Sequence, residues 1–271
     1  MNKKILVFGK GYIGEKVAKF LGAEISSAYI QSIEDILRIV RTRKPDIVIN
    51  CIGYTGKNNV DDCELVLSKT LNANTFIPIM FAEVCLRHNI KLVHLSSGCI
   101  FHYDYKQLPI NETKIPDFFN LYYSRSKIYS ERALEVAASQ YNFLILRIRI
   151  PLDCYPHPKN LLTKLIKYRQ VIDMRNSVTY IPDFLKALKH LININARGIF
   201  NVVSRGGLKY CDLMEEYRKF IPAYQYRVIP YKSLKVTRTN LILSTKRLEK
   251  SGFKVRSIKQ VMNECVKRYV Q

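Results

Sequence analysis

The sequence predicts an α/β fold: a doubly wound parallel sheet with helices on both faces, followed by a smaller C-terminal lobe. Three observations support this prediction. Strand-like and helix-like segments alternate from the N-terminus to Pro151. A glycine-rich loop follows the first apolar run, at Gly9 to Gly14. Beyond Pro151 the alternation becomes irregular, as expected of a second lobe.

The expected elements of the first part alternate between short apolar runs and amphipathic segments. The expected strands are 3–9, 24–29, 46–53, 91–97 and 142–151. The expected helices are 15–22, 33–44, 61–88 and 121–138. Gly22 is expected to end the first helix because glycine readily adopts the left-handed conformation of a helix C-terminus.

The second part is expected to be mixed and interwoven with the first. Its expected helices are 158–169, 177–192 and 257–270, and its expected strands are 199–204 and 226–230. No internal repeat or long linker separates the parts. We expect a nucleotide-binding domain at 1–155, joined by 176–205, and a substrate-binding lobe at 156–175 and 206–271. The substrate is expected to bind between them.

The net charge of +22 is unusual for a chain of 271 residues that is 48% hydrophobic. Such a charge suits nucleic acid, a membrane surface or phosphorylated ligands. The 44 basic residues, however, are dispersed along the chain without a block of five like charges. We interpret most of the excess as a solvated surface and expect no specific nucleic-acid partner.

Composition also restricts the compartment. The longest apolar run, 143–152, contains Arg147 and Arg149 and is too short to span a bilayer, so no membrane partner is expected. The N-terminal run is interpreted as a strand, not as a secretory signal. Seven scattered cysteines without a CxxC pair indicate neither a disulfide framework nor a zinc site. We therefore expect a cytoplasmic protein without a metal.

The glycine loop has the spacing of a dinucleotide site. The first glycine makes the tight turn, the second lets the backbone approach the pyrophosphate, and the third allows the helix to pack closely on the strand. The phosphates would then lie at the helix N-terminus. The expected cofactor loop consists of Gly9, Lys10, Gly11, Tyr12, Ile13 and Gly14. The alternative is three glycines in an ordinary turn.

The expected cofactor is NADPH rather than NADH. Sites for NAD usually place Asp or Glu after the second strand, where this chain reads SSAYIQ at 26–31 and has no carboxylate before Glu34. Lys10 lies in the glycine loop and could face a 2′-phosphate. The alternative for Lys10 is simple exposure to solvent.

Three further residues predict a carbonyl reductase. Tyr123 and Lys127 are four apart in a helical segment, so both project from one face. Ser97 ends the strand upstream of them. Tyr123 would donate the proton, Lys127 would lower the pKa of Tyr123, and Ser97 would bind the carbonyl oxygen. The alternative is a surface helix with an incidental Tyr and Lys.

Cys99 follows Ser97 by two residues, and the residues alone leave two interpretations open. A thiol near lysines can ionise and act as a base. Composition alone favours the other interpretation, a small buried apolar side chain.

The chain resembles a known family in six segments. These are GYTGKNNVDDCE (53–64), SSGCIFHYD (96–104), YYSRSK (122–127), LRIRIP (146–151), PKNLLTKLIKY (158–168) and RTNLILSTKRL (238–248). They resemble plant and viral UDP-4-keto-6-deoxy-glucose 3,5-epimerase/4-reductases, relatives of dTDP-4-dehydrorhamnose reductase. These enzymes are extended short-chain dehydrogenase/reductases with a Rossmann fold.

The resemblance implies roles for individual residues. The reductase residues fall on Ser97 (usually Thr), Tyr123 and Lys127, and the epimerase pair falls on Cys99 and Lys164. The segment beneath the cofactor riboses falls on Asn50, Cys51, Ile52 and Gly53. The residues along the nucleotide sugar fall on Lys57, Asn59, Asn160 and Arg238. The chain departs from the family in a glycine loop shorter by one residue and in Ser244, where an acidic residue is usual.

The activity that follows is conversion of UDP-4-keto-6-deoxy-D-glucose to UDP-L-rhamnose with NADPH. A homodimer, and supply of the substrate by a separate UDP-glucose 4,6-dehydratase, are compatible with this interpretation. Two alternatives are a 4-reductase that acts on an already epimerised nucleotide sugar and a non-catalytic NADP-binding regulatory subunit. Neither the nucleotide base nor the pathway follows from the residues.

Overall fold

The computed structural model describes residues 3–138, 140–234 and 237–271. The chain divides into two compact units. The first unit comprises Met1–Ile100, Pro116–Arg147 and Leu191–Phe200, and the second comprises Phe101–Ile115, Ile148–His190 and Asn201–Gln271. The predicted domains were assigned by the ligand each part binds, and that division stays a prediction.

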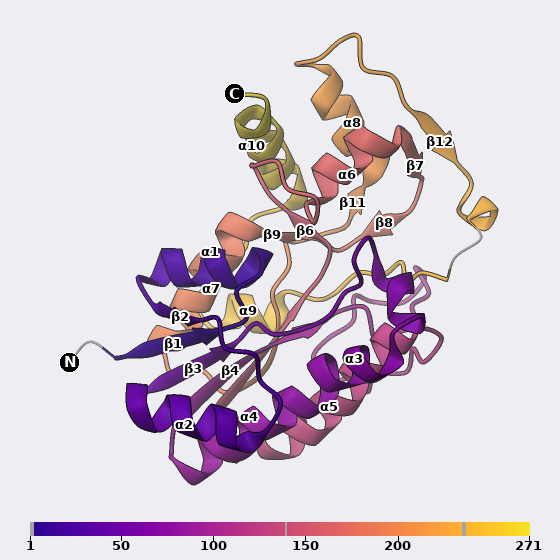
Figure 1. The fold of residues 1–271 in the computed structure, drawn as a ribbon. Helices are drawn as coiled ribbons and strands as arrows, with labels where there is room; N and C mark the ends of the chain where they lie inside the picture. Colours follow the sequence, from indigo (N-terminus) through magenta and orange to yellow (C-terminus); the bar gives the residue numbers. More distant parts are fainter. Residues whose placement is uncertain (1–2, 139, 235–236) are drawn as a thin grey trace. The chain divides into compact units, whose positions relative to one another are not determined.

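A six-stranded sheet forms the centre of the first unit (Figure 1). Its strands are β1 (Ile5–Phe8), β2 (Glu24–Ser26), β3 (Ile47–Asn50), β4 (Lys91–Ser97), β5 (Phe143–Ile148) and β10 (Gly198–Asn201). Their order is β10-β5-β4-β3-β1-β2. β1 pairs in parallel with both β2 and β3, and β3 pairs in parallel with β4. The predicted parallel sheet is confirmed.

Helices of the first unit cover both faces of this sheet. They are α1 (Tyr12–Leu21), α2 (Ile33–Arg43), α3 (Leu67–Leu71), α4 (Ile77–Arg87) and α5 (Tyr122–Ala138). Figure 1 shows α2, α4 and α5 on one face and α1 on the other, so the doubly wound arrangement is also confirmed. α1 ends as predicted at Gly22, which has a left-handed φ of 60°.

β1 and β3 consist mainly of apolar residues because helices bury them on both faces. β3 and β4 are buried along their whole length. In the core between the sheet and α4, Phe8 packs against Phe81 with ring centroids 4.7 Å apart. The ends of α2 follow from its sequence, since Ser32 and Asp35 form a capping box at its N-terminus.

The helical region predicted over 61–88 is helical for most of its length, but it is not one regular helix. The structure has a 3₁₀ helix (Val60–Glu64), then α3, then a π-helical turn (Asn72–Phe76) that leads into α4. Polar side chains in the π turn are held from outside the helix. Asn74 bonds the backbone of Tyr54, and Thr75 Oγ1 donates to the carbonyl of Ser126 at 2.7 Å. These tertiary bonds explain a break that apolar spacing does not show.

The second unit contains short strands and five helices among its described residues. Its strands are β6 (Pro151–Leu152), β7 (Gln170–Ile172), β8 (Arg175–Asn176), β9 (Thr179–Tyr180), β11 (Leu208–Lys209) and β12 (Arg227–Ile229). Its helices are α6 (Leu161–Tyr168), α7 (Ile181–Asn193), α8 (Tyr210–Arg218), α9 (Lys246–Lys250) and α10 (Ile258–Val270), and Tyr231–Ser233 is a 3₁₀ turn. The strands pair as β11–β8, β12–β7 and β6–β9. The sequence missed α8, α9 and most of these strands.

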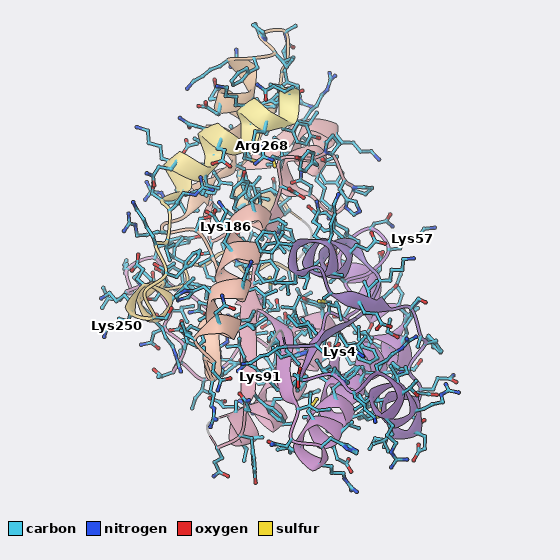
Figure 2. All side chains as sticks on the ribbon, turned by 90° about the vertical axis from the view of Figure 1, so that its left-hand side faces the viewer. Lys4, Lys57, Lys91, Lys186, Lys250 and Arg268 are labelled. Carbon is cyan, nitrogen blue, oxygen red and sulfur yellow. The ribbon has the colours of Figure 1, made fainter. Side chains whose placement is uncertain are left out.

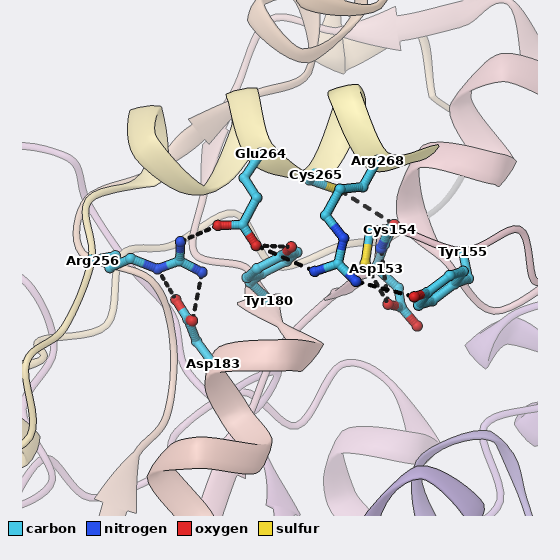
Figure 3. Close-up of polar contacts among 9 residues, drawn as sticks. All are labelled: Asp153, Cys154, Tyr155, Tyr180, Asp183, Arg256, Glu264, Cys265 and Arg268. Carbon is cyan, nitrogen blue, oxygen red and sulfur yellow. Dashed lines mark hydrogen bonds and ion pairs between the residues drawn. The ribbon is translucent and has the colours of Figure 1, made fainter. Parts of the chain in front are cut away.

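An ion-pair network joins α7 to α10 in the second unit (Figure 3). The Nε and Nη2 atoms of Arg256 donate to the two carboxylate oxygens of Asp183 at 2.9 and 2.6 Å. Arg256 also pairs with Glu264, and the hydroxyl of Tyr180 donates to Glu264 at 2.9 Å. Burial alone would raise the pKa of Glu264, but the bonds from Arg256 and Tyr180 hold it below its usual value.

The positive charge is spread over separate elements. The labelled cations of Figure 2 come from the segment before β1, the loop after β3, β4, α7, α9 and α10; they are Lys4, Lys57, Lys91, Lys186, Lys250 and Arg268. All except Lys91 are exposed. This dispersal agrees with a solvated surface, while the lack of a nucleic-acid partner stays a prediction.

Two features are absent from the described residues. No helix combines the length and apolarity needed to cross a bilayer. No group of three or more His, Cys, Asp or Glu side chains is arranged to hold a metal ion. Seven cysteines are present as free thiols.

Candidate active site

The strand order indicates where a ligand would bind in the first unit. From β1 the chain moves to β2 on one side, whereas β3 lies on the other side of β1. In open α/β sheets, ligands bind at the carboxyl ends of the strands where the order reverses in this way. The loop Gly9–Gly14 follows β1, and the segment Asn50–Gly53 follows β3. Both predicted cofactor segments therefore flank this point.

The three glycines of the loop have different surroundings. Gly9 has a φ of 96°, and a Cβ there would lie 2.7 Å from the amide nitrogen of Ile52. A Cβ on Gly14 would overlap the carbonyl oxygen of Gly9. Gly11, in contrast, faces open space, and it precedes α1 without a side-chain cap. Uncapped amides beside open space fit a bound pyrophosphate.

The segment after β3 connects the glycine loop to the reactive residues. Asn50 is fully buried; its Oδ1 accepts from the amide of Ile52 at 2.9 Å. The amide of Cys51 donates to the carbonyl of Phe8 at 2.9 Å. A Cβ on Gly53 would lie 3.3 Å from Nζ of Lys127. The backbone here therefore passes directly over the ammonium group.

β4 and α5 are held together at the predicted reductase residues. Ser97 ends β4, and Tyr123 and Lys127 lie on buried positions of α5. The hydroxyl of Ser124 donates to the carbonyl of Cys99 at 2.6 Å. Nζ of Lys127 donates to the carbonyl of Leu95 at 3.3 Å. Ser97, Cys99, Tyr123 and Lys127 are thus brought to one end of the sheet.

The hydroxyl of Ser97 is oriented by its own loop. Its Oγ accepts from the amide of Cys99 at 3.0 Å. Because this bond uses an acceptor position, the hydroxyl hydrogen is available to donate to a carbonyl oxygen.

Burial lowers the pKa of Lys127 to about 8, although the Glu131 carboxylate opposes this shift. Lys127 is therefore still mostly a cation at neutral pH. Its charge favours ionisation of a neighbouring phenol, which is the role the sequence predicted toward Tyr123.

Asn74 is a site residue that the sequence analysis missed. Its amide accepts from the amide of Tyr54 at 2.8 Å and donates to the carbonyl of Tyr54 at 2.9 Å. A Cβ on Gly53 would lie 3.3 Å from Oδ1 of Asn74, so this side chain borders Lys127 and Gly53. π turns frequently occur at functional sites, but apolar spacing carries no signal for one.

Lys57 and Asn59 lie in the loop after β3. Lys57 is exposed. Asn59 begins the 3₁₀ helix, and its Oδ1 accepts from the amide of Asp61 at 2.7 Å. Their contacts to a nucleotide sugar stay predictions.

The second unit holds the remaining predicted residues. Lys164 lies half-buried on α6, and its pKa is lowered by burial and by the charges of Lys159 and Arg238. The positive charges of Lys159 and Arg238 thus act on Lys164 in the same direction as burial. Such positive charges favour an anionic ligand, because an anion would relieve the repulsion.

Asn160 has a structural role that the sequence did not predict. It is fully buried and begins α6, where its Oδ1 accepts from the amides of Asp153 and Leu162. Its Nδ2 donates to the carbonyls of Asp153 and Tyr155 at 2.8 and 2.9 Å. These bonds fix the start of the helix that carries Lys164. A direct bond from Asn160 to a substrate stays a prediction.

The segment that carries Arg238 is anchored by a buried arginine. Nη1 of Arg149 donates to Oγ1 of Thr239 at 2.9 Å, and Nη2 donates to Oδ1 of Asn176 at 2.7 Å. Asn176 also accepts from the amide of Leu241 at 3.1 Å. The predicted site residues therefore form two groups, one in each unit.

The family model described as "RmlD substrate binding domain" matches residues 4–271. A curated relative is the trifunctional UDP-glucose 4,6-dehydratase/UDP-4-keto-6-deoxy-D-glucose 3,5-epimerase/UDP-4-keto-L-rhamnose-reductase of Arabidopsis thaliana, 28% identical. That alignment covers 95% of this chain but only 40% of the plant enzyme. The bifunctional dTDP-4-dehydrorhamnose 3,5-epimerase/dTDP-4-dehydrorhamnose reductase of the same plant is 29% identical, over 82% of this chain and 77% of that protein.

Solved structures show the same fold. The L780 UDP-rhamnose synthase of Acanthamoeba polyphaga mimivirus superposes with a TM-score of 0.92 at 26% identity, over 99% of this chain and 100% of that one. The dTDP-4-dehydrorhamnose reductase of Bacillus anthracis, in complex with NADP, has a TM-score of 0.83 at 20% identity, over 97% of both chains. At this identity the second likeness shows the fold alone.

Proposed function

The chain belongs to the RmlD substrate binding domain family, and from this premise we propose that it is an NADPH-dependent reductase of a 4-keto nucleotide sugar. The observation that carries the proposal is the convergence of Ser97, Tyr123 and Lys127 beside the segment that packs on the glycine loop. The relatives named as reductases of 4-keto sugars support the substrate class.

NADPH, when bound, supplies the hydride for carbon 4 of the sugar. The amides at the start of α1 would bind its pyrophosphate, for which Gly11 leaves room. Lys127, which lies next to Gly53, would bond the nicotinamide ribose. Lys10 is exposed in the loop and would pair with the 2′-phosphate, since the end of β2 offers no carboxylate to a ribose hydroxyl.

The protein's own side chains handle the proton. Ser97 donates a hydrogen bond to the carbonyl oxygen and polarises it. Tyr123 gives its phenolic proton to that oxygen as carbon 4 becomes tetrahedral. The cation at Lys127 stabilises the phenolate that remains. The ketone thus gains one hydride and one proton and becomes an alcohol.

A second proposal is that the same site first epimerises carbons 3 and 5. The trifunctional and the bifunctional plant relatives and the mimivirus UDP-rhamnose synthase favour it, the last because it aligns over its whole length. A 4-keto group acidifies the neighbouring C–H bonds, so at each of carbons 3 and 5 the Cys99 thiolate would remove one proton and the Lys164 ammonium would deliver one to the opposite face. Proton exchange with water would restore both groups between the two steps. The product from the UDP sugar would be UDP-L-rhamnose. The comparisons as a whole favour the reductase more strongly than this epimerase step.

One assay tests both proposals. Purified protein is mixed with NADPH and either UDP-4-keto-6-deoxy-glucose or the already epimerised UDP-4-keto-rhamnose. A reductase oxidises NADPH with at least one ketone, and a bifunctional enzyme makes UDP-L-rhamnose from the first. We expect faster turnover with NADPH than with NADH; equal or faster turnover with NADH would refute the cofactor assignment. Absence of NADPH oxidation with both ketones would leave only a binding role.

A further inference from the structure

A fully buried ion pair lies behind the reactive residues of the first unit. Nε and Nη2 of Arg147 donate to Oε1 of Glu131 at 3.0 and 2.6 Å. Glu131 is 1% exposed and Arg147 is 0% exposed. The other carboxylate oxygen of Glu131 accepts from the hydroxyl of Ser96. The pair therefore joins α5, which carries Tyr123 and Lys127, to β5 and to β4 beside Ser97.

Burying such a pair brings little net stability. Removing two charges from water costs about as much as their attraction returns, and an apolar pair of similar volume is often as stable. The position of Glu131 suggests another use. It follows Lys127 by four residues on α5, so the two side chains are neighbours on one face of the helix.

The other titratable groups around Lys127 do not supply a negative charge. Cys51 lies on the β3 side; burial raises the pKa of its thiol to about 12, although Lys127 opposes this. His94 lies on β4; burial and the charge of Lys127 hold the pKa of its imidazole well below the usual value. Both are neutral at working pH. Tyr123, on α5, is the proton donor and is neutral before each turnover.

Lys127 itself receives little help from hydrogen bonds. Its ammonium donates to one carbonyl within the described residues, that of Leu95. A lysine buried in this way tends to lose its proton, because low-dielectric surroundings disfavour the charged form. A carboxylate one helical turn away opposes that loss.

We propose that Glu131 is a positioning residue that keeps Lys127 cationic beneath the cofactor. Arg147 and Ser96 hold the carboxylate in place, and Arg147 also offsets the cost of burying it. The inference rests on the proposed reductase function. It adds a residue that contacts neither cofactor nor substrate but sets the pH range in which the site works.

The direct test measures the titration of Lys127. The protein is labelled with ¹³C at lysine Cε, and the Lys127 resonance is identified by its loss in Lys127→Met. In Glu131→Gln we expect the Lys127 midpoint to fall by about one pH unit, because a nearby carboxylate shifts a buried lysine by at least that much. This measurement needs no substrate, so it is independent of the proposed activity.

The kinetic test follows kcat/KM for ketone reduction against pH. Loss of a proton from the Tyr123–Lys127 pair ends activity at high pH, and removing a nearby negative charge makes that loss easier. The alkaline limb of Glu131→Gln should therefore move down by about one pH unit, with near-normal activity retained at lower pH. A merely structural defect would lower the rate by the same factor at every pH.

Two further variants make the test decisive. Glu135→Gln removes the same charge from an exposed position one turn further along α5 and should shift neither titration nor rate profile. If Glu131→Gln fails to fold, Glu131→Gln/Arg147→Met removes both buried charges and leaves none unpaired. It should show a smaller downward shift, because loss of the Arg147 cation partly offsets loss of the carboxylate. The inference would be overturned if the titration midpoint of Lys127 is unchanged in Glu131→Gln, or in the double variant when Glu131→Gln does not fold. A shifted midpoint in a protein that reduces no 4-keto nucleotide sugar would instead refute the proposed function.

Discussion

Two buried lysines of the first unit are held in different ways. Lys91 donates to the Oδ1 atoms of Asn142 and Asn195 and to the carbonyl of Ala196, at 2.9, 3.2 and 2.7 Å. Lys127 has one backbone acceptor among the described residues, but a carboxylate lies one turn away. Lys91, the first residue of β4, is therefore well hydrogen-bonded. Lys127, on α5, donates near the other end of β4 and keeps N–H donors for a ligand.

The first prediction tests whether Tyr123 donates the proton to the carbonyl oxygen. Tyr123→Phe removes the donor but keeps the ring, so ketone reduction should fall by about 10²–10⁴-fold while NADPH binding changes little. Stopped-flow oxidation of NADPH measures the rate, and fluorescence titration measures the binding. Tyr122→Phe, at the preceding residue of α5, is the matched control and should keep the activity. Near-normal reduction by Tyr123→Phe would show that another group donates the proton.

At Cys99 and Lys164 the prediction separates the two half-reactions. Cys99→Ser should reduce exchange of the sugar's carbon 3 and carbon 5 hydrogens with deuterated water by about 10²-fold or more, because a hydroxyl is a far weaker acid than a thiol. Lys164→Met should block net inversion yet leave some exchange. Both variants should still reduce the unepimerised ketone slowly, which mass spectrometry and product analysis can detect.

The control for this pair is Cys211→Ser, which alters another partly exposed thiol, on α8. It should change neither exchange nor reduction. If Cys99→Ser incorporates deuterium at the normal rate, the epimerase proposal fails and the reductase alone remains.

In the loop between β1 and α1, the three glycines of one motif have two different roles. Gly9 and Gly14 are required by the protein's own packing, since a Cβ on Gly14 would overlap the carbonyl of Gly9. Gly11 is not, because nothing lies near its Cβ position. The absence of a side chain at Gly11 is therefore explained by the ligand and not by the protein's own packing.

This division gives a prediction for a matched pair of alanine variants. Gly14→Ala should lower the free energy of unfolding by about 2 kcal/mol, because the strand and helix must separate to admit a methyl group. Gly11→Ala should fold normally, as its φ of −122° suits any residue, but should bind NADPH at least about tenfold more weakly. Chemical denaturation and NADPH titration of both variants check this. Normal NADPH affinity in Gly11→Ala would place the pyrophosphate elsewhere.

On the scale of the whole molecule, the buried Lys91 makes the free energy of unfolding depend on pH in the alkaline range. Burial, with the charges of Lys3 and Arg197, lowers the pKa of Lys91 to about 8. Between this value and the unfolded value of about 10.4, the unfolded chain binds a proton that the folded chain does not. Stability conferred by this group must therefore rise with pH across that window.

Lys91→Met tests this linkage. The wild-type protein should gain thermal stability relative to Lys91→Met as the pH rises from about 8 to about 10, because only the wild type loses the buried charge. Differential scanning calorimetry at several pH values measures the difference. Lys10→Met, at an exposed lysine, should show no such trend. A constant difference between wild type and Lys91→Met would mean that Lys91 stays charged in the folded protein.

Much of the first unit was determined by the sequence alone. Local apolar runs predicted β1, β3, β4 and β5, and Gly22 predicted the end of α1, because these features depend on neighbouring residues. The residues Gly9, Ser97, Tyr123 and Lys127 were found because each lies at a strand end or on one helical face. Their catalytic roles stay predictions.

Features that depend on contacts between residues far apart in the sequence became known only from the tertiary structure. The π turn at Asn74 depends on a bond to Tyr54, twenty residues away, and the use of Asn160 as a helix cap depends on the fold of the segment before it. The ion pair between Glu131 and Arg147 could not be predicted from the sequence because sixteen positions separate the two residues. Spacing reports neighbours along a helix or strand, whereas a buried polar group is satisfied by whichever chain segment packs against it.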